Sequence, residues 1–357
     1  MKKHLVPLLA VCLLLSGCSG LPAAREMGDM ALLRTMGVDT SPAGVAVTGS
    51  TGPRAKGLQS EGEAALTLAA DRESLSAACL AMQGQSDSYV FFGYVDQILL
   101  GEDLAERGVR PVLDYFARDS ELGLGAQLWL IQGATAREAL STGGDQGADS
   151  RLENIQHDSK MGIANLTRTA GEVYADLLER GSAYVPALTP AGEGAVLAES
   201  GYGILKGETL LGFLGGEEAK GLELLAGGPS ADILEAGPPS QRASVKITSA
   251  HTRSGLEFYG DAPSVLRLVC EIEARLSEYE SRPDESGLLR LRTELEARER
   301  SRIEAALVRL QVWGTDCTGL GAKAGVAHPA RWQRVQESWP EWFGRVPVEI
   351  RVEVKIL

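Results

Sequence analysis

The sequence predicts an α+β fold of several domains, in which mixed or antiparallel sheets pack against helices. Three segments carry this prediction. Apolar residues occupy every second position over residues 266–276 and again over 346–356, which is typical of strands with one buried face. Between them, residues 284–310 place leucine and isoleucine at helical spacing. Strands and helices alternate without a regular β–α–β repeat, and we therefore expect α+β rather than α/β.

Length and charge narrow the range of functions. The chain has 357 residues, of which 44% are hydrophobic and 23% charged, values that fit a folded protein of two or three domains. It carries 48 acidic and 35 basic residues, a net charge of -13. This charge repels phosphate backbones, so nucleic acid is not expected as a partner.

Residues 1–17 have the features of a lipoprotein signal peptide. Lys2 and Lys3 precede an apolar run over residues 5–15, which is too short to span a bilayer and is typical of an export signal. Leu15-Ser16-Gly17-Cys18 resembles a bacterial lipobox. We expect cleavage between Gly17 and Cys18 and a diacylglyceryl group, with palmitate-like chains, on the Cys18 sulfur. The alternative is an ordinary secretory signal with a chance cysteine.

Two acyl chains on Cys18 would hold the mature protein durably at a membrane, whereas one chain gives only marginal binding. Removal of residues 1–17 takes away two lysines and leaves 33 basic against 48 acidic residues, a net charge of -15. Three further cysteines remain after Cys18 is used: Cys79, Cys270 and Cys317. An odd number argues against a disulfide framework, and we expect all three to be buried and structural.

Residues 18–145 are expected to form an N-terminal domain of short alternating elements. Gly108 and Pro111 should split one of its helices into two pieces. The expected strands cover residues 44–48, 89–100 and 126–132, and the expected helices cover 71–82, 101–116 and a short segment from residue 135.

A loop over residues 141–150 leads to a middle domain at 146–240. Its first element is predicted as a helix from residue 155 that ends at Gly181. A hairpin then joins strands at 202–205 and 209–214. A helix over 217–225 and one short strand between two Gly-Pro turns complete this domain.

The C-terminal domain, residues 241–357, holds the strongest patterns. The strand at 266–276 and the helix at 284–310 both have one apolar side. Pairs such as Glu294 and Arg298, four residues apart, indicate that the other side of the helix faces solvent. The last strand alternates so regularly that we expect an antiparallel strand with one exposed face.

No catalytic motif is evident. The histidines His157, His251 and His328 have no partners at metal-ligand spacing. The glycine-rich segments at 201–207 and 319–325 lack the spacing of a phosphate loop and are read as turns. We therefore expect neither an enzyme nor a bound cofactor or metal.

An aromatic cluster near the C-terminus leaves two interpretations open. Trp332, Trp339 and Phe343 recur with Val335 at the spacing of one helix face, and Trp342 lies close beside it. This face packs on the C-terminal sheet in one interpretation. In the other, part of it is a surface for a partner or for the membrane interface.

Short motifs spread over about 330 residues together resemble one family, the Ger(x)C lipoproteins, which are the C subunits of spore nutrient-germinant receptors. The tryptophan that usually follows the lipid cysteine in that family is absent, and Tyr94 stands where many members have histidine. The residues that carry the resemblance are Arg25-Glu26-Met27, Met36-Gly37-Val38-Asp39, Phe91-Phe92-Gly93, Ile98 to Ala105, Gly108, Gly201 to Lys206, Gln311, Asp316, Gly319, Gly321, Pro329, Trp332, Trp339 and Phe343.

The resemblance implies a multi-domain α+β protein without catalytic activity. It also implies a lipid anchor in the spore inner membrane, with the folded part on the outer side, and two polytopic membrane subunits as partners when nutrients trigger germination. A lipid-anchored solute-binding protein of a transporter is the main alternative. That class normally consists of β–α–β units, which the sequence pattern does not predict here. A cell-envelope hydrolase is disfavoured because no nucleophile with a base is evident.

Overall fold

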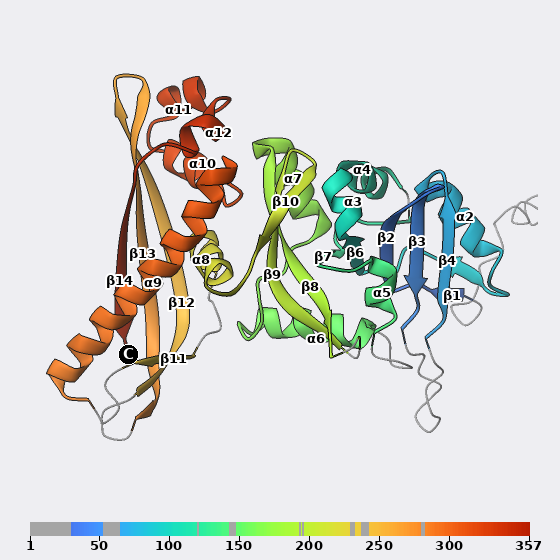
Figure 1. Cartoon of the computed structure of the whole chain (residues 1–357), viewed down its shortest axis with the longest axis horizontal. Coiled ribbons are helices and arrows are strands. Elements are labelled where there is room, and N and C mark those ends of the chain that lie inside the picture. Colours follow the sequence, from blue (N-terminus) through green and yellow to red (C-terminus); the bar gives the residue numbers. More distant parts are fainter. Residues whose placement is uncertain are drawn as a thin grey trace, which may run out of the picture.

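The computed structural model is elongated (Figure 1). An eight-stranded sheet with its helices forms one end, and a four-stranded sheet with one long helix forms the other. This arrangement confirms the α+β, multi-domain fold class. The predicted signal peptide and Cys18 lie outside the described residues. The structure describes residues 30–52, 65–119, 121–142, 148–192, 194, 196–228, 233–236, 243–279 and 283–357.

The large sheet has the strand order β10-β9-β8-β7-β6-β2-β3-β4. A separate parallel pair joins β1 (Met30–Leu32) to β5 (Tyr89–Phe91). The strands of the large sheet are β2 (Thr35–Ser41), β3 (Gly44–Ser50), β4 (Thr67–Arg72), β6 (Gln97–Gly101), β7 (Gln127–Ile131), β8 (Ser182–Ala191), β9 (Val196–Lys206) and β10 (Thr209–Leu214).

The centre of this sheet is parallel and contains β–α–β connections, although the sequence pattern indicated no regular β–α–β repeat. Strands β2, β6, β7 and β8 all run in the same direction, and helices connect β6 to β7 and β7 to β8. Every residue of β6 and of β7 is buried. Strands buried on both faces show no alternation of apolar and polar residues, so the sequence pattern could not mark them as parallel core strands.

Helices cover both faces of the large sheet, and their ends explain two further corrections. The predicted helix from residue 155 to Gly181 is two helices, because Gly162 adopts a left-handed conformation and Thr169 caps a new helix together with Glu172. The predicted helix at 71–82 begins only at residue 75, since β4 extends to Arg72 and Ser74 is the cap. One face carries α2 (Leu75–Gln83), α3 (Glu102–Arg107), α4 (Arg110–Arg118) and α7 (Ala170–Arg180), and the other carries α5 (Ala136–Leu140) and α6 (Asp149–Lys160).

Two predictions in this region fare differently. The split of the helix at Gly108 is confirmed, because this glycine has a φ of +142° between α3 and α4. The predicted strand at 89–100 is two strands, since residues 92–96 form a turn closed by the Val95 amide and the Phe92 carbonyl.

The sheet continues across the predicted domain boundary at residues 145 and 146. Strand β7 precedes that boundary and β8 follows it, yet Leu130 and Ile131 pair with Ala187 and Leu188. The division into domains at 18–145, 146–240 and 241–357 stays a prediction.

The other end of the molecule is built around two long strands. Strand β13 (Ala262–Tyr279) buries its residues at 266, 268, 270, 272 and 274, which confirms the period-two pattern read from the sequence. It pairs antiparallel with β12 (Ala243–Tyr259), and β11 (Ile233–Ala236) lies beyond β12. Helix α9 (Glu285–Trp313) packs across the sheet, and α8 (Gly216–Ala226) packs against α9 on the side of the large sheet (Figure 1).

The last strand, β14 (Val348–Ile356), pairs with β13 in parallel, so the prediction of an antiparallel strand is wrong. Its alternation fixes which side chains are buried but not the direction of its neighbour. The chain passes from β13 through α9 back to the same end of the sheet, and β14 therefore starts where β13 starts. The connection contains α10 (Leu320–Gly325), α11 (Pro329–Val335) and α12 (Trp339–Phe343).

Asp39 shows why one of the resembling motifs is needed by the fold. Its buried carboxylate lies at the start of α5 and accepts hydrogen bonds from the amides of Ala136 (2.7 Å) and Arg137 (3.0 Å). A Cβ on Gly101 would lie 2.1 Å from Asp39 Oδ1, so only glycine fits there. One carboxylate thus joins the strand β2 to a helix about 100 residues away in the chain.

We expect Asp39→Ala to lower the free energy of unfolding by about 1–3 kcal/mol, because one buried and one partly buried amide lose their acceptor. Asp71→Ala is the matched control, since Asp71 also contacts Arg137 (2.6 Å) but through an exposed ion pair, which contributes less than about 1 kcal/mol. Urea unfolding followed by circular dichroism measures both. Equal losses in the two variants would contradict this role of Asp39.

Candidate functional site: a pocket between the two sheets

The predicted aromatic residues lie on two short helices rather than on one. Trp332 is in α11, and Trp339, Trp342 and Phe343 are in α12. Pro340 stands in the first turn of α12, where its missing amide and fixed φ favour the start of a new helix. The single helix face predicted from the spacing is therefore wrong, although the side chains still converge.

These rings form a chain of contacts. The centroids of Trp332 and Trp339 are 5.4 Å apart, and those of Trp339 and Phe343 are 5.9 Å apart. Trp339 and Phe343 are buried in the core that α9 forms with the C-terminal sheet. Packing accounts for these two rings, whereas Trp332 and Trp342 stay half-buried. Arg345 lies over the Trp342 ring at 4.1 Å.

A single carboxylate holds this region together. Asp316, which is 7% exposed, accepts hydrogen bonds from the amides of Leu320 (2.8 Å) and Gly321 (2.7 Å) and from Trp339 Nε1 (2.8 Å). A Cβ on Gly321 would lie 2.2 Å from the Trp339 ring, so glycine allows the helix α10 to approach this ring. Asp316 thereby fixes the start of α10 and the orientation of Trp339 together.

A pocket of about 570 Å³ opens beside this cluster. One wall comes from the end of α7 and from the paired residues Ser182 of β8 and Lys206 of β9. The other wall comes from residues after α9 and from α11 and α12. The lining residues are Glu179, Arg180, Gly181, Ser182, Lys206, Gly314, Asp316, Ala322, Trp332, Gln336, Glu337, Trp339 and Pro340.

Two cations belong to the first wall. Arg180 is paired with Asp176, which also pairs with Arg168 at 2.8 Å. Lys206 donates a hydrogen bond to the carbonyl of Trp313 (2.9 Å) at the end of α9, so it bridges the large sheet to the long helix. Nearby, desolvation lowers the pKa of Lys323, while the charge of Asp316 opposes that effect. The acidic residues Glu179 and Glu337 are exposed.

The three cysteines that follow Cys18 do not contribute reactive groups. Cys79, Cys270 and Cys317 are free and buried, as the sequence predicts. Burial raises the pKa of Cys79 and of Cys270 to about 11, and it also raises the pKa of Cys317. These thiols therefore stay protonated at neutral pH and act as small apolar side chains.

The described part of the chain contains neither a helix that could cross a membrane nor a cluster of metal-ligating side chains. Among these residues, no helix is both long and apolar enough to cross a membrane. Within the same ranges, histidine, cysteine and acidic side chains form no group of three or more that could hold a metal ion.

Sequence reasoning singled out the aromatic residues of this site but not Arg180 or the role of Asp316. Arg180 occupies the last turn of α7, where a basic residue has an ordinary helix-end explanation. The residues of the opposite wall come from more than 100 residues further along the chain. The local signal for the role of Asp316 was its position just before the glycine-rich segment that starts α10. Its carboxylate caps the amides of Leu320 and Gly321, four and five residues later.

We expect Asp316→Ala to lower the free energy of unfolding by at least about 2 kcal/mol, because three donors, two of them backbone amides, lose a charged acceptor. Glu337→Ala, an exposed residue of the same pocket, should change it by less than about 0.5 kcal/mol. Thermal unfolding measured by calorimetry compares the two. A near-neutral Asp316→Ala variant would show that the carboxylate does not hold this region.

Comparison with known proteins identifies the family. The family model of the spore germination protein N-terminal domain matches residues 23–190, and that of the spore germination B3/GerAC-like C-terminal domain matches residues 200–357. The crystal structure of the GerBC protein has the same fold, with a TM-score of 0.63 and 19% identity, over 90% of this chain and 96% of that chain. No curated protein sequence matches. The two successive matches confirm the resemblance read from the sequence, and the chain belongs to the GerAC-like family of spore germination proteins.

Proposed function

We propose that this protein is the lipid-anchored C-type subunit of a spore germinant receptor, and that it takes part in germination triggered by nutrients. The observation that carries the proposal is the order of the two family matches, which together span residues 23–357 and leave only 191–199 between them. In this role the protein catalyses no reaction. Its partners are two polytopic membrane subunits, and no observation favours the alternative of a transporter-linked solute-binding protein.

The anchor in this proposal is a diacylglyceryl group on Cys18. Cys18 lies only five residues before the first matched residue, so little chain separates the lipid from the folded part. The segment from Cys18 to Met30 can reach about 40 Å at full extension, which follows from the spacing of successive residues. The folded part therefore stays close to the outer side of the spore inner membrane.

Anchoring also explains how an acidic protein can serve as a membrane subunit. A net charge of -15 on the mature chain gives no attraction to anionic lipid headgroups. Two acyl chains supply the attachment instead, at about 0.8 kcal/mol for each buried methylene. Confinement to the membrane raises the local concentration of the protein around its integral partners, so a weak docking surface is sufficient.

We expect Cys18→Ala to release the protein from spore membranes and to reduce the rate of nutrient-triggered germination at least about tenfold, because the acyl chains are lost. Membrane fractionation, mass spectrometry of the mature amino terminus and the loss of optical density of spores measure these effects. Ser19→Ala is the matched control, since it keeps the Cys18 thiol.

Copurification from solubilised spore membranes tests the partners. A tagged wild-type protein should bring down two polytopic subunits. A Cys18→Ala protein that remained in the membrane and supported normal germination would contradict the proposal, as would wild-type protein with an unmodified amino terminus.

A further inference from the structure

The pocket described above lies between segments that match different family domains. Glu179, Arg180 and Ser182 belong to the first match, and Lys206 with the residues after α9 belongs to the second. Its volume of about 570 Å³ is in the range of sites for small organic molecules. Concave sites between domains are a common place for such ligands.

The first wall offers hydrogen-bond donors with positive charge. The ion pair of Arg180 with Asp176 uses Nη2, while Nε is buried and has no hydrogen-bond partner among the described residues. A guanidinium has five N–H donors, so this pair leaves donors for another acceptor. The Lys206 ammonium has three donors, of which the contact to the Trp313 carbonyl uses one.

The negative charges of the lining limit what these cations can bind. The Asp316 carboxylate is occupied by three donors and is turned toward the core. Glu179 and Glu337 also line the pocket, but, in contrast to Asp316, they are exposed to solvent. They repel ligands with several negative charges, such as polyphosphates, more strongly than ligands with one.

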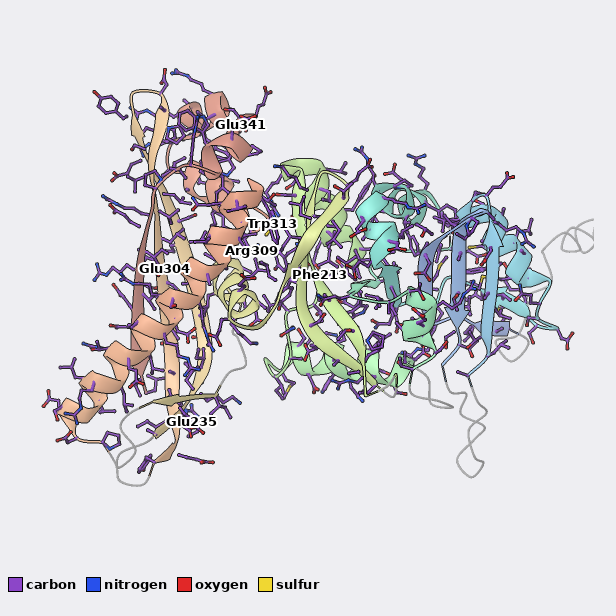
Figure 2. The ribbon with its side chains drawn as sticks, in the orientation of Figure 1. Phe213, Glu235, Glu304, Arg309, Trp313 and Glu341 are labelled. Carbon is purple, nitrogen blue, oxygen red and sulfur yellow. The ribbon has the colours of Figure 1, made fainter. Side chains whose placement is uncertain are left out.

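The opposite wall contributes apolar surface beside its polar residues Asp316, Gln336 and Glu337. The half-buried ring of Trp332 and the edge of Trp339 line it, together with Pro340 and Ala322. Figure 2 shows Arg309 and Trp313 on the side of α9 that faces β10, and the Arg309 guanidinium lies over the Trp313 ring at 4.8 Å. Apolar surface opposite two cations suits a molecule with one charged end and one apolar end.

We propose that this pocket binds a small organic monocarboxylate with a compact apolar body. The carboxylate accepts hydrogen bonds from Lys206 and Arg180, and the apolar body lies against Trp332. This binding site goes beyond the proposed function, because it requires neither the lipid anchor nor the membrane partners. A ligand here would contact both family segments at once.

The test uses the full-length protein purified in detergent and two matched probes, cyclohexanecarboxylate and its neutral amide, cyclohexanecarboxamide. Neither probe absorbs where tryptophan is excited, so binding is followed as a change in the total tryptophan fluorescence, to which Trp332 and Trp339 of the pocket contribute. We expect a saturable change with the acid and at least about tenfold weaker binding of the amide, since a charge-assisted hydrogen bond is worth about 1.4 kcal/mol or more.

Lys206→Gln should weaken binding of the acid at least about tenfold while leaving the melting temperature nearly unchanged, because the glutamine amide can still donate to the Trp313 carbonyl. Lys246→Gln, an exposed lysine on the four-stranded sheet, is the control and should bind as the wild type does. Trp332→Phe should reduce the fluorescence change.

Three results would overturn the proposal: no saturable response to the acid, equal binding of the acid and the amide, or unchanged binding in Lys206→Gln. Failure of lipid anchoring in the Cys18→Ala experiment would leave this test unaffected, so the two proposals can fail separately.

Discussion

The main-chain pairing between β8 and β9 is the constraint on which the rest of this architecture depends. The two strands are paired from Ser182 with Lys206 to Ala191 with Val196, along the whole length of β8. Strand β8 up to Pro190 lies in the first family match and β9 from Ser200 onward lies in the second, so the two matched segments share one sheet. The two segments cannot separate without breaking the main-chain hydrogen bonds of this strand pair, which would leave backbone donors and acceptors without partners. The hydroxyl of Tyr202 strengthens this junction, because it accepts from the Leu166 amide and donates to the buried Glu223 of α8.

The shared sheet places the pocket where the large sheet meets the long helix α9. Ser182 and Lys206 form the last pair of the ladder, and both line the pocket. Lys206 also donates to the carbonyl of Trp313 at the end of α9, the helix that packs across the four-stranded sheet. A molecule bound there would favour whichever arrangement of the two ends gives it the better contacts, and only a difference in affinity between arrangements can shift their populations.

The sequence predicted those helices and strands that have one buried face and one solvent-exposed face. Strand β13 was identified because Leu266, Leu268 and Cys270 recur at every second position. Helix α9 was identified because its leucine and isoleucine residues recur at helical spacing, although its charged residues Glu299 and Arg302 are buried as well. Strands β6 and β7 lack that contrast, being buried on both faces, and the parallel centre of the large sheet was missed for this reason. The pairing direction of β14 and the proximity of Arg180 to Trp332 depend on chain paths of many residues, and local periodicity contains no information about them.

The motifs that identify the family are explained largely by packing at the joints of the fold. Gly201, with a φ of +105°, lies so close to β10 that a Cβ would be 2.0 Å from the Leu214 carbonyl oxygen. Asp39 and Asp316 each hold the start of a helix from a distance in the chain or across a turn. Such residues specify the arrangement of the elements, and that is why short motifs spread over the whole chain identify the fold even when overall identity to a solved relative is 19%. They say little about what is bound, because a group fully engaged in packing has no donor or acceptor left for a ligand. The chemistry of binding therefore has to come from groups with unused donors beside these joints, and Lys206 and Arg180 are in that position.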